Sequence, residues 1–410
     1  MTRALRQIGE STFSSLRVRN YRLYYIGQII SNCGTWMQSI AQGWLVLKLT
    51  NSGTALGLIT ALQSLPVLLF GAWGGVLADR FPKRKLLIVT QSIFAVLALT
   101  LGTLVATGVV RLWMVAVLAM CLGLNNAIDN PARQSFVVEM VGEGELKNAV
   151  TLFSSLVNLS RIIGPLIAGA LITTIGLAPC FILNGLSYFA VVAMLLMMRA
   201  SELHPALRLA NARGQIAAGL HYVWTTPVLR DILVIMAIIG TLTYEFQVTL
   251  PLIAQQTFHG NAASYAALSA SLGVGAVIGG LVTAGRKRTS FRAVVQAALL
   301  FGAAVLVASL MPSLRLTAVM LVGVGFFSIT FSAMGNTTLQ LTSTPQMRGR
   351  VMSLWGIAFL GSTTIGGPII GFIGQNVGPQ AALAIGGLAA LAAAAYGLLA
   401  LRRRPVGAPG

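Results

Sequence analysis

Long apolar runs, separated by short polar segments, follow one another along the whole chain of 410 residues. Most runs hold about 20 residues, which as a helix is enough to cross the hydrocarbon core of a bilayer. They are too long and too uniformly apolar for the strands of a membrane β-barrel, in which apolar and polar positions alternate. The pattern therefore predicts twelve transmembrane helices, at residues 23–47, 54–78, 85–107, 112–131, 148–173, 179–199, 229–253, 263–284, 291–310, 314–340, 350–374 and 379–401.

The composition also indicates a membrane protein. Hydrophobic residues make up 56% of the chain and charged residues 9%, whereas a soluble domain carries about 25% charged residues. The mean hydropathy is +0.81. Because only helices and closed barrels satisfy their backbone hydrogen bonds in lipid, we expect an all-α integral membrane fold.

The basic residues are distributed unevenly between the two sides of the membrane. The net charge of +19 would by itself also suit a nucleic-acid-binding protein. With the twelve helices placed, however, one side receives all 28 Lys and Arg residues except Lys48, Arg111, Arg315 and Arg161. By the positive-inside rule that side is the cytoplasm, and both termini lie there. We therefore expect a multi-pass protein of the plasma (inner) membrane, whose basic loops face anionic lipid headgroups and no nucleic acid.

The predicted spans fall into two groups of six. The N-terminal half covers residues 21–199 and the C-terminal half residues 229–402, with cytoplasmic ends at 1–20 and 403–410. The cytoplasmic linker between the halves, residues 200–228, places apolar side chains on one face of a helix, at Ile216, Leu220, Val223 and Trp224. Such an amphipathic helix is typical of a tether that rests on the membrane surface.

Several features recur between the halves. The segment Gly74–Lys85 joins two apolar runs, and a reduced copy at Gly279–Arg288 joins the corresponding runs of the second half. Gly-Pro pairs also recur, at Gly164–Pro165 in the fifth span and Gly367–Pro368 in the eleventh, where they favour helix bends. Two parallel-repeat halves that rock about a site at the middle of the membrane form a known transporter architecture.

These features resemble the major facilitator superfamily over nearly the whole chain. Residues Gly75–Arg84 are similar to its signature for the loop between spans two and three, with departures at Pro82 and Lys83. The Gly-Pro pair of the fifth span resembles the antiporter signature of this superfamily. The runs Asn126–Gln134 and Gly219–Pro227 are similar to the drug and siderophore exporter branch, which includes macrolide-efflux and enterobactin-exporter-like proteins. The arginine that many drug/proton antiporters carry within the fourth span is absent here.

The resemblance also implies a gate at the cytoplasmic side. In the family, the loop aspartate faces the start of span eleven, and the basic residues after it contact an acidic group near the end of span four. The equivalent contact here joins Lys83 or Arg84 to Asp129, which has an alternative partner in Arg133, one helical turn away. Retention of basic residues in the cytoplasm explains the same charges without a gate. The gate candidates are Asp79, Arg80, Lys83, Arg84, Asp129, Arg133, Arg348 and Arg350.

Two charged residues, Glu245 and Arg161, lie well inside the predicted spans. Burying each costs about 2.5–3.5 kcal/mol on insertion scales, which makes both functional candidates. A carboxylate in a medium of low dielectric constant favours its protonated form. Glu245, on a helix face with Thr241 and Tyr244, is therefore a candidate for proton coupling, together with Arg161. The alternatives are a structural carboxylate paired with Arg161, and an arginine that binds substrate or braces the bend at Gly164–Pro165.

Polar residues form stripes along several predicted helices. A stripe that faces lipid is unfavourable, and in this superfamily the first, fourth, seventh and tenth spans line the transport cavity. Hydrogen bonds between helices are the alternative explanation. The candidates for contact with substrate, two aromatic residues among them, are Gln28, Asn32, Thr35, Trp36, Ser39, Asn125, Asn158, Tyr244, Phe246, Ser332 and Asn336.

Sequence motifs for ATP hydrolysis by a P-loop, for zinc-dependent proteolysis and for serine hydrolysis are absent, so an enzyme is not favoured. The three cysteines lie far apart in apolar spans and predict neither a disulfide nor a metal site. We therefore predict a monomeric secondary active transporter that exports amphipathic small molecules, such as drugs, siderophores or secondary metabolites, by alternating access. The proton gradient is its energy source, and no cofactor is expected. A lysophospholipid translocase, a small-metabolite importer and a non-transporting membrane adaptor are the alternatives.

Overall fold

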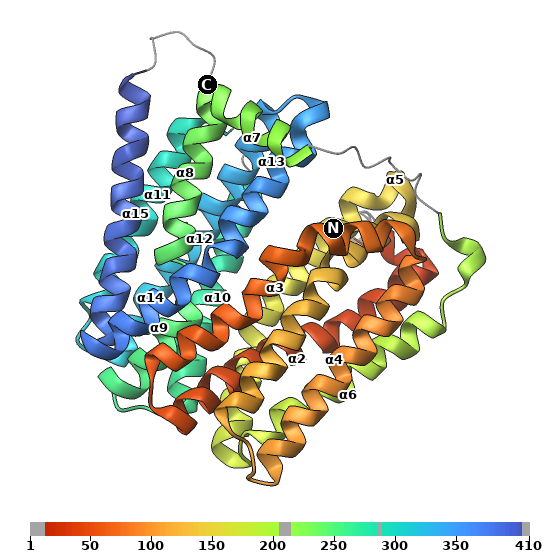
Figure 1. Cartoon of the computed structure of the whole chain (residues 1–410), viewed down its shortest axis with the longest axis horizontal. Coiled ribbons are helices and arrows are strands. Elements are labelled where there is room, and N and C mark those ends of the chain that lie inside the picture. The colour runs from red at the N-terminus through yellow and green to blue at the C-terminus, as the bar shows by residue number, and fades with distance from the viewer. Residues whose placement is uncertain (1–12, 205–214, 285–288, 404–410) are drawn as a thin grey trace, which may run out of the picture. The chain divides into compact units, whose positions relative to one another are not determined.

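The computed structural model describes residues 13–204, 215–284 and 289–403, and every regular element in these ranges is helical (Figure 1). Several predictions fall outside the described residues. They concern the start of the N-terminal segment, the first part of the linker, the basic cluster Arg286–Arg288 of the second repeat copy, and nearly all of the C-terminal tail.

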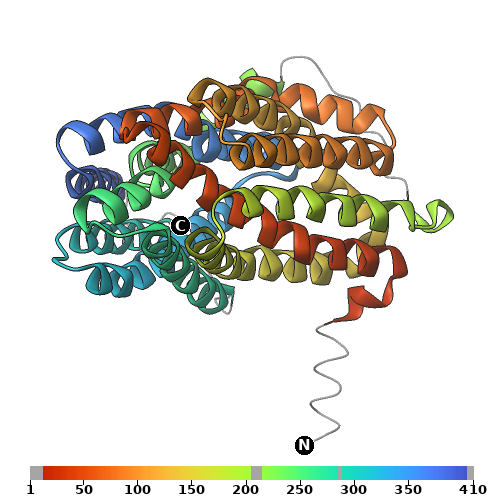
Figure 2. The same ribbon diagram turned by 90° about the horizontal axis from the view of Figure 1, so that it is seen from below.

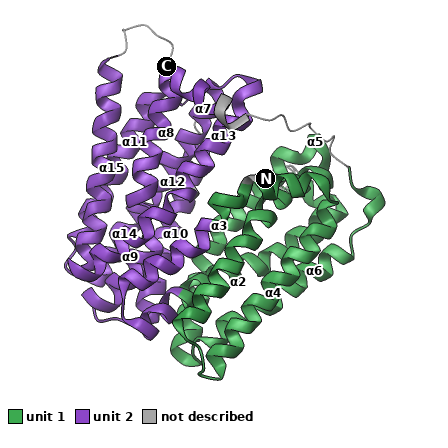
Figure 3. Cartoon of the chain, viewed as in Figure 1, with its two compact units in different colours: residues 1–42, 66–210 green, residues 43–65, 211–410 purple. Residues whose placement is uncertain are grey.

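The chain divides into two compact units, which Figure 3 colours separately. Unit 1 contains residues 1–42 and 66–210, and unit 2 contains residues 43–65 and 211–410. The predicted halves differ from this division at residues 43–65, which were assigned to the N-terminal half and pack within unit 2.

Unit 1 is built from long helices. α2 (Arg19–Thr50) and α3 (Gly53–Arg80) each contribute a part, and α4 (Lys83–Ala106), α5 (Leu112–Thr174) and α6 (Ala178–Leu196) lie wholly within it. Single 3-10 turns at Ser14–Arg17 and Ala200–Glu202 complete the unit. α4 packs against both α5 and α6.

α5 contains the predicted fourth and fifth spans and the polar link between them as one element of 63 residues. It is bent at Gly142, where φ is 67°. This conformation is not helical but is accessible to glycine without steric strain, so α5 consists of two helical segments that meet at a kink at Gly142.

Unit 2 contains nine whole α-helices among its described residues, the end of α2, the first part of α3, and two π-helical turns at Ile253–Thr257 and Ile357–Gly361. α10 packs on α12, and α11 packs on both α12 and α15; Figure 2 shows them from below. The helices are α7 (Gln215–Thr225), α8 (Pro227–Leu242), α9 (Phe246–Leu252), α10 (Ala262–Ala284), α11 (Phe291–Ser309), α12 (Leu314–Thr342), α13 (Pro345–Gly356), α14 (Thr363–Asn376) and α15 (Pro379–Arg402).

The first part of α3 belongs to unit 2 because glycines let it approach α14 closely. A Cβ atom on Gly57 would lie 2.2 Å from the carbonyl oxygen of Gly367, so no larger residue fits without movement of a helix. The hydroxyl groups of Ser64 and Thr364 are 3.0 Å apart at the same contact. These contacts hold the first part of α3, within residues 53–65, against α14 in unit 2.

α7 occupies the second part of the predicted linker, as its apolar spacing indicated. Its predicted apolar face is divided in the structure. Val223 is buried in unit 2, whereas Leu220 and Trp224 are exposed. α7 packs on α13, and the Tyr222 hydroxyl accepts a hydrogen bond from the Thr344 backbone N–H at 3.2 Å. The position of α7 at the membrane surface stays a prediction.

Ten helical stretches among the described residues are long and apolar enough to cross a membrane. α5 counts as one of these stretches although it covers two predicted spans, and α2 contains the predicted first span. The predicted seventh and eleventh spans are each interrupted, the first between α8 and α9 and the second by a π turn between α13 and α14. The number of twelve spans stays a prediction.

Candidate functional site

Glu245 lies where the predicted seventh span is broken. It stands in the connection between α8 and α9, immediately before α9. The prediction of one continuous helix over residues 229–253, with Glu245 on a face shared with Thr241, is wrong at this point. Thr243 fixes the connection, because its Oγ1 donates a hydrogen bond to the Gly386 carbonyl oxygen at 2.7 Å.

The carboxyl group of Glu245 is buried against α14. The residue is 2% exposed. A Cβ atom on Gly366 would lie 3.0 Å from Glu245 Oε1, and one on Gly367 would lie 3.6 Å from Oε2. Thr363 provides a side-chain hydrogen bond, and Oε1 has no hydrogen-bond partner among the described residues. Burial of an ionised carboxylate is unfavourable unless its oxygens are paired, and burial of a neutral carboxyl group is much less so. The site therefore suits a carboxyl group that binds and releases a proton.

Glycine residues allow α14, the helix that covers Glu245, to pack closely against α8. A Cβ atom on Gly366 would lie 1.7 Å from the Thr241 carbonyl oxygen, which two atoms cannot do. α14 runs on through Gly367–Pro368, and in unit 1 α5 runs on through Gly164–Pro165. A Cβ atom on Gly164 would lie 2.7 Å from the Cys33 carbonyl oxygen. In both helices the glycine allows close packing, and the predicted bends stay predictions.

Asp129 is the centre of a second buried polar cluster, in unit 1. It is fully buried and forms an ion pair with Arg133, whose Nε lies 3.0 Å from Asp129 Oδ2. Thr90 Oγ1 and Gln91 Nε2 donate to Asp129 Oδ1 at 2.7 and 2.9 Å. This carboxylate thus has an arginine and two neutral donors from α4 and α5.

The basic residues at the start of α4 have other partners, so the predicted contact of Asp129 with Lys83 or Arg84 is wrong. Lys83 Nζ lies 2.7 Å from Glu139 Oε1. Arg84 donates to two backbone carbonyl oxygens at the end of α6, where the helix dipole favours a cation. Arg133 neutralises Asp129 instead, as the alternative explanation required. Glu139 was not predicted from the sequence. Its only signal there is that it is an acidic residue within an otherwise apolar stretch.

Hydrogen bonds connect this cluster to α2. Arg133 Nη1 donates to Gln28 Oε1 at 2.6 Å, and Asn32 Nδ2 donates to the same oxygen at 2.9 Å. Asn125 Nδ2 donates to the Thr90 carbonyl oxygen at 2.8 Å. Gln28 and Asn125 are both buried. These predicted cavity residues therefore form interhelical hydrogen bonds, and their contact with substrate stays a prediction.

The other predicted cavity residues of unit 1 lie on α2 and α5. The guanidinium carbon of Arg161 lies 5.0 Å from the centre of the Trp36 ring. Thr35 Oγ1 is 3.1 Å from a tyrosine hydroxyl of α6, and Asn158 donates to a backbone carbonyl one turn earlier in α5. Ser39 is half-buried. Of these residues, the structure brings Arg161 and Trp36 into direct contact.

In unit 2 the predicted cavity residues Tyr244 and Phe246 belong to an aromatic cluster. Tyr244 donates a hydrogen bond to a backbone carbonyl of α12 at 2.9 Å, and its ring centre lies 5.4 Å from that of Phe301. Phe246 is buried, which fits a packing role. Asn336 accepts a hydrogen bond from a glutamine one turn later, and Ser332 on the same helix is half-buried.

The remaining gate candidates are divided between the units. Asp79 and Arg80 are exposed at the end of α3, in unit 1. In unit 2, Arg348 donates from Nε to a carbonyl oxygen at the end of α12, and Arg350 Nη1 lies 3.4 Å from a methionine sulfur. The predicted contact of Asp79 with the start of α13 stays a prediction.

Asp231, near the start of α8, is a further buried carboxylate that was missed in the sequence. It is 2% exposed, accepts a hydrogen bond from the Tyr396 hydroxyl at 3.0 Å, and lies 3.2 Å from Arg230 Nε. Its sequence signal is an acidic residue next to a basic one at a predicted span boundary, which by itself is typical of the membrane surface.

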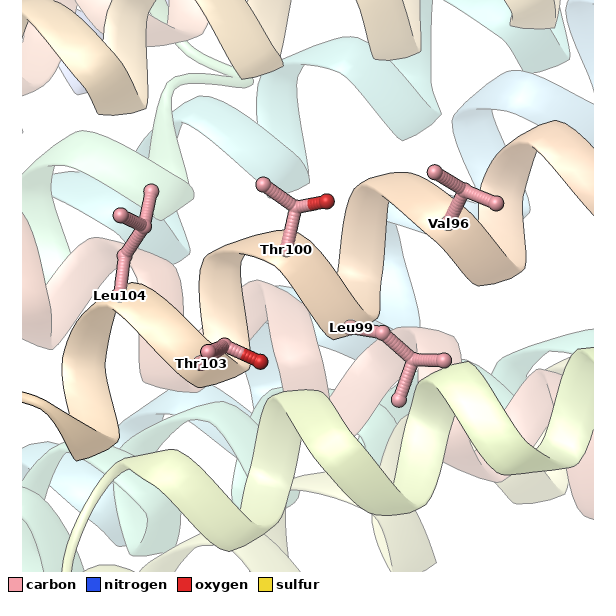
Figure 4. Close-up of a pocket in the computed structure, with 5 residues that line it drawn as sticks. All are labelled: Val96, Leu99, Thr100, Thr103 and Leu104. Carbon is pink, nitrogen blue, oxygen red and sulfur yellow. The ribbon is translucent and has the colours of Figure 1, made fainter.

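A recess along α4, in unit 1, is lined by none of these groups. Figure 4 shows its lining side chains on one helix: Val96, Leu99, Thr100, Thr103 and Leu104. It contains no titratable group and none of the predicted site residues, so it contributes nothing to the candidate site.

Comparison with known proteins places these features in context. The model of a family described as transmembrane secretion effector matches residues 10–406. The chain is 26% identical to the multidrug efflux pump Tap of Mycolicibacterium fortuitum, over 82% of this chain and 84% of that protein. It is 24% identical to the enterobactin exporter EntS of Citrobacter koseri, over 90% and 88%.

Two further similarities are more limited. The chain is 26% identical to the staphyloferrin A transporter of Staphylococcus aureus, but over only 43% of this chain and 44% of that protein. A solved structure of a point mutant of the peptide transporter POT superposes with a TM-score of 0.76 at 14% identity, covering 93% of this chain and 94% of the other. At that identity the likeness concerns the fold alone.

Proposed function

Because the chain belongs to the transmembrane secretion effector family of the major facilitator superfamily, we propose that it exports drugs, siderophores or related amphipathic molecules in exchange for protons. The predicted all-helical major facilitator fold is confirmed by the likeness to solved transporters. The chain is thus a multi-pass membrane transporter of small molecules. Its place in the inner membrane, its cytoplasmic termini, its monomeric state and its lack of enzymatic activity are parts of the proposal.

The substrate class rests on the relatives that the chain matches over most of its length. One is a multidrug efflux pump and another is an enterobactin exporter. Export of such molecules needs a cavity that accepts an apolar body with polar groups. The half-buried or exposed polar residues of α2, α5 and α12, including Asn32, Asn158 and Ser332, are our candidates for its polar lining.

The burial of Glu245 in the break between α8 and α9 is the observation that carries the proposed proton coupling. The carboxyl group lies beside Gly366 and Gly367 of α14, where it would contact an added Cβ atom, and has one unpartnered oxygen among the described residues. Protonation of Glu245 from the outer side removes the unfavourable charge. Release of the proton to the cytoplasm restores the charge when the protein switches from outward-open to inward-open. Each proton that enters supplies about 2.3 kcal/mol per 100 mV of membrane potential, in addition to the pH gradient.

The test uses the purified full-length protein in liposomes with an imposed pH gradient. We expect wild-type protein to accumulate an amphipathic drug only with the gradient. Glu245→Gln, which keeps the size of the side chain and resembles the protonated form, should abolish gradient-driven transport but retain exchange of internal for external drug. Asp231→Asn is the matched control, because it also removes a buried carboxylate of unit 2.

Each result discriminates between the alternatives. Gradient-driven transport that persists in Glu245→Gln would refute the coupling role. Absence of any drug transport by correctly folded wild-type protein would refute export and favour an adaptor. Movement of labelled lysophospholipid between leaflets, without drug transport, would favour a lipid translocase.

A further inference from the structure

The aromatic cluster of unit 2 borders the break that holds Glu245, and the proposed proton coupling does not use its rings. We propose that the half-buried side of this cluster, formed by Tyr244 and Phe359, binds an aromatic ring of the exported molecule. The proposal rests on the export function above and narrows its substrates to amphipathic molecules that carry an aromatic group. Phe359 was not among the residues predicted from the sequence to contact substrate.

The first argument is the uneven burial of the rings. Tyr244 is the common member of the cluster, with its ring centre 5.1 Å from that of Phe359 and 5.4 Å from that of Phe301. Phe246 and Phe301 are buried, whereas Tyr244 and Phe359 are half-buried. The buried rings therefore pack the interior of unit 2, and the two half-buried rings form the side of the cluster that a ligand can reach.

The second argument is the geometry of the two half-buried rings. Tyr244 and Phe359 make a T-shaped contact, with an angle of 70° between the ring planes. Such a contact uses the edge of one ring and one face of the other, so it leaves further ring surface on both side chains. Aromatic rings prefer edge-to-face or offset-stacked neighbours, and a third ring can join the pair in either way.

The third argument is the backbone that carries Phe359. This residue lies in the π turn Ile357–Gly361, between α13 and α14, and π turns of this kind are frequent at functional sites. Gly240 of α8 lets the turn approach closely, since a Cβ atom there would lie 2.6 Å from the Ala358 carbonyl oxygen. A binding group that packing already holds in place loses little conformational entropy when the ligand arrives.

The fourth argument is the polar surface that begins beside the rings. The Tyr244 hydroxyl donates a hydrogen bond to the Ser328 carbonyl oxygen of α12 at 2.9 Å. Ser328, Ser332 and Asn336 are half-buried and follow at intervals of four residues, so they share one face of α12. This face extends about 12 Å along the helix axis, and its polar groups are unfavourable toward lipid. An aromatic group bound at Tyr244 and Phe359 thus leaves the polar part of an amphipathic molecule beside hydroxyl and amide groups.

The experiment uses two uncharged sugar amphiphiles that are identical except that one ends in a phenyl ring and the other in a cyclohexyl ring. Equilibrium binding is measured on the full-length protein in lipid nanodiscs, and transport is measured in liposomes. We expect wild-type protein to prefer the phenyl probe, after correction for the partition of both probes into lipid. Phe359→Leu should raise the Kd of the phenyl probe about threefold to tenfold, the usual effect of losing an aromatic pair, and leave that of the cyclohexyl probe within about twofold.

Three further variants separate the ring from the fold. Phe359→Tyr keeps an aromatic ring and should retain the preference for the phenyl probe. Tyr244→Phe should weaken binding of this probe less than Tyr244→Leu does. Phe372→Leu, at an exposed phenylalanine of α14, is the matched control and should leave both Kd values unchanged. Thermal unfolding of each variant shows whether it is folded.

Equal weakening of both probes in a folded Phe359→Leu protein would overturn the proposal and favour a packing role for this ring. Wild-type protein that does not bind the phenyl probe, or binds it without preference, would also overturn it. Binding that depends on the Phe359 ring, in a protein that transports neither probe, would support the aromatic site and refute the export function.

Discussion

Replacement of Gly366 by alanine tests whether the contact between α14 and α8 sets the environment of Glu245. The new Cβ atom would lie 1.7 Å from the Thr241 carbonyl oxygen and 3.0 Å from Glu245 Oε1. Non-bonded carbon and oxygen atoms need more than about 3 Å, so α14 must move away by about 1 Å or more. Overpacking of this kind costs about 1–3 kcal/mol.

The displacement should also separate α14 from the Glu245 carboxyl group, because the same glycine borders both. We expect Gly366→Ala to lower the midpoint of thermal unfolding by several degrees and to reduce gradient-driven transport more than drug exchange. The assays are thermal unfolding of the purified protein and the liposome measurement described above. Gly280→Ala in α10 is the control, since a Cβ atom there meets nothing within 4 Å. A Gly366→Ala protein as stable and as well coupled as wild type would refute the reasoning.

Two further predictions concern the ion pairs of unit 1. Asp129→Asn leaves Arg133 without its fully buried carboxylate partner and should destabilise the protein by about 3–5 kcal/mol. The control is Glu202→Gln, in an exposed pair with Arg199, which should cost about 0–1 kcal/mol. Equal unfolding midpoints of the two variants would contradict this prediction. A double-mutant cycle with Lys83→Met and Glu139→Gln should give a coupling energy above the roughly 1 kcal/mol of exposed pairs, because both side chains are only 11% exposed. If the two substitutions change the free energy of unfolding additively, the ion pair contributes nothing to stability.

The sequence predicted those features that depend on neighbouring positions along the chain. The apolar spacing of residues 216–224 correctly indicated a helix, which is α7. It did not indicate which side of α7 meets protein, because that depends on the packing of α7 on α13 and on the hydrogen bond between Tyr222 and Thr344. Local periodicity determines that a helix forms, and distant residues determine which face is covered.

The candidate sites show the same limit. The apolar surroundings of Glu245 in the sequence were enough to single it out as a buried carboxylate. The break in its helix was not predictable, because Thr243 bonds there to Gly386, which is distant along the chain. Likewise, Arg133 one turn from Asp129 was foreseeable as its partner, whereas Lys83 and Glu139 meet only because α4 packs against α5.

The two buried carboxylates Asp129 and Glu245 differ in the donors that surround them, and from this difference we propose different roles for them. Asp129 has the guanidinium of Arg133 and two neutral donors, so both of its oxygens have partners. Glu245 has a hydrogen bond with Thr363 and a second oxygen without a partner among the described residues. A proton can therefore join and leave Glu245 without breaking an ion pair that the structure records. In our proposal the ion pair of Asp129 with Arg133 holds α2, α4 and α5 together, and Glu245 is the group that carries the transported proton.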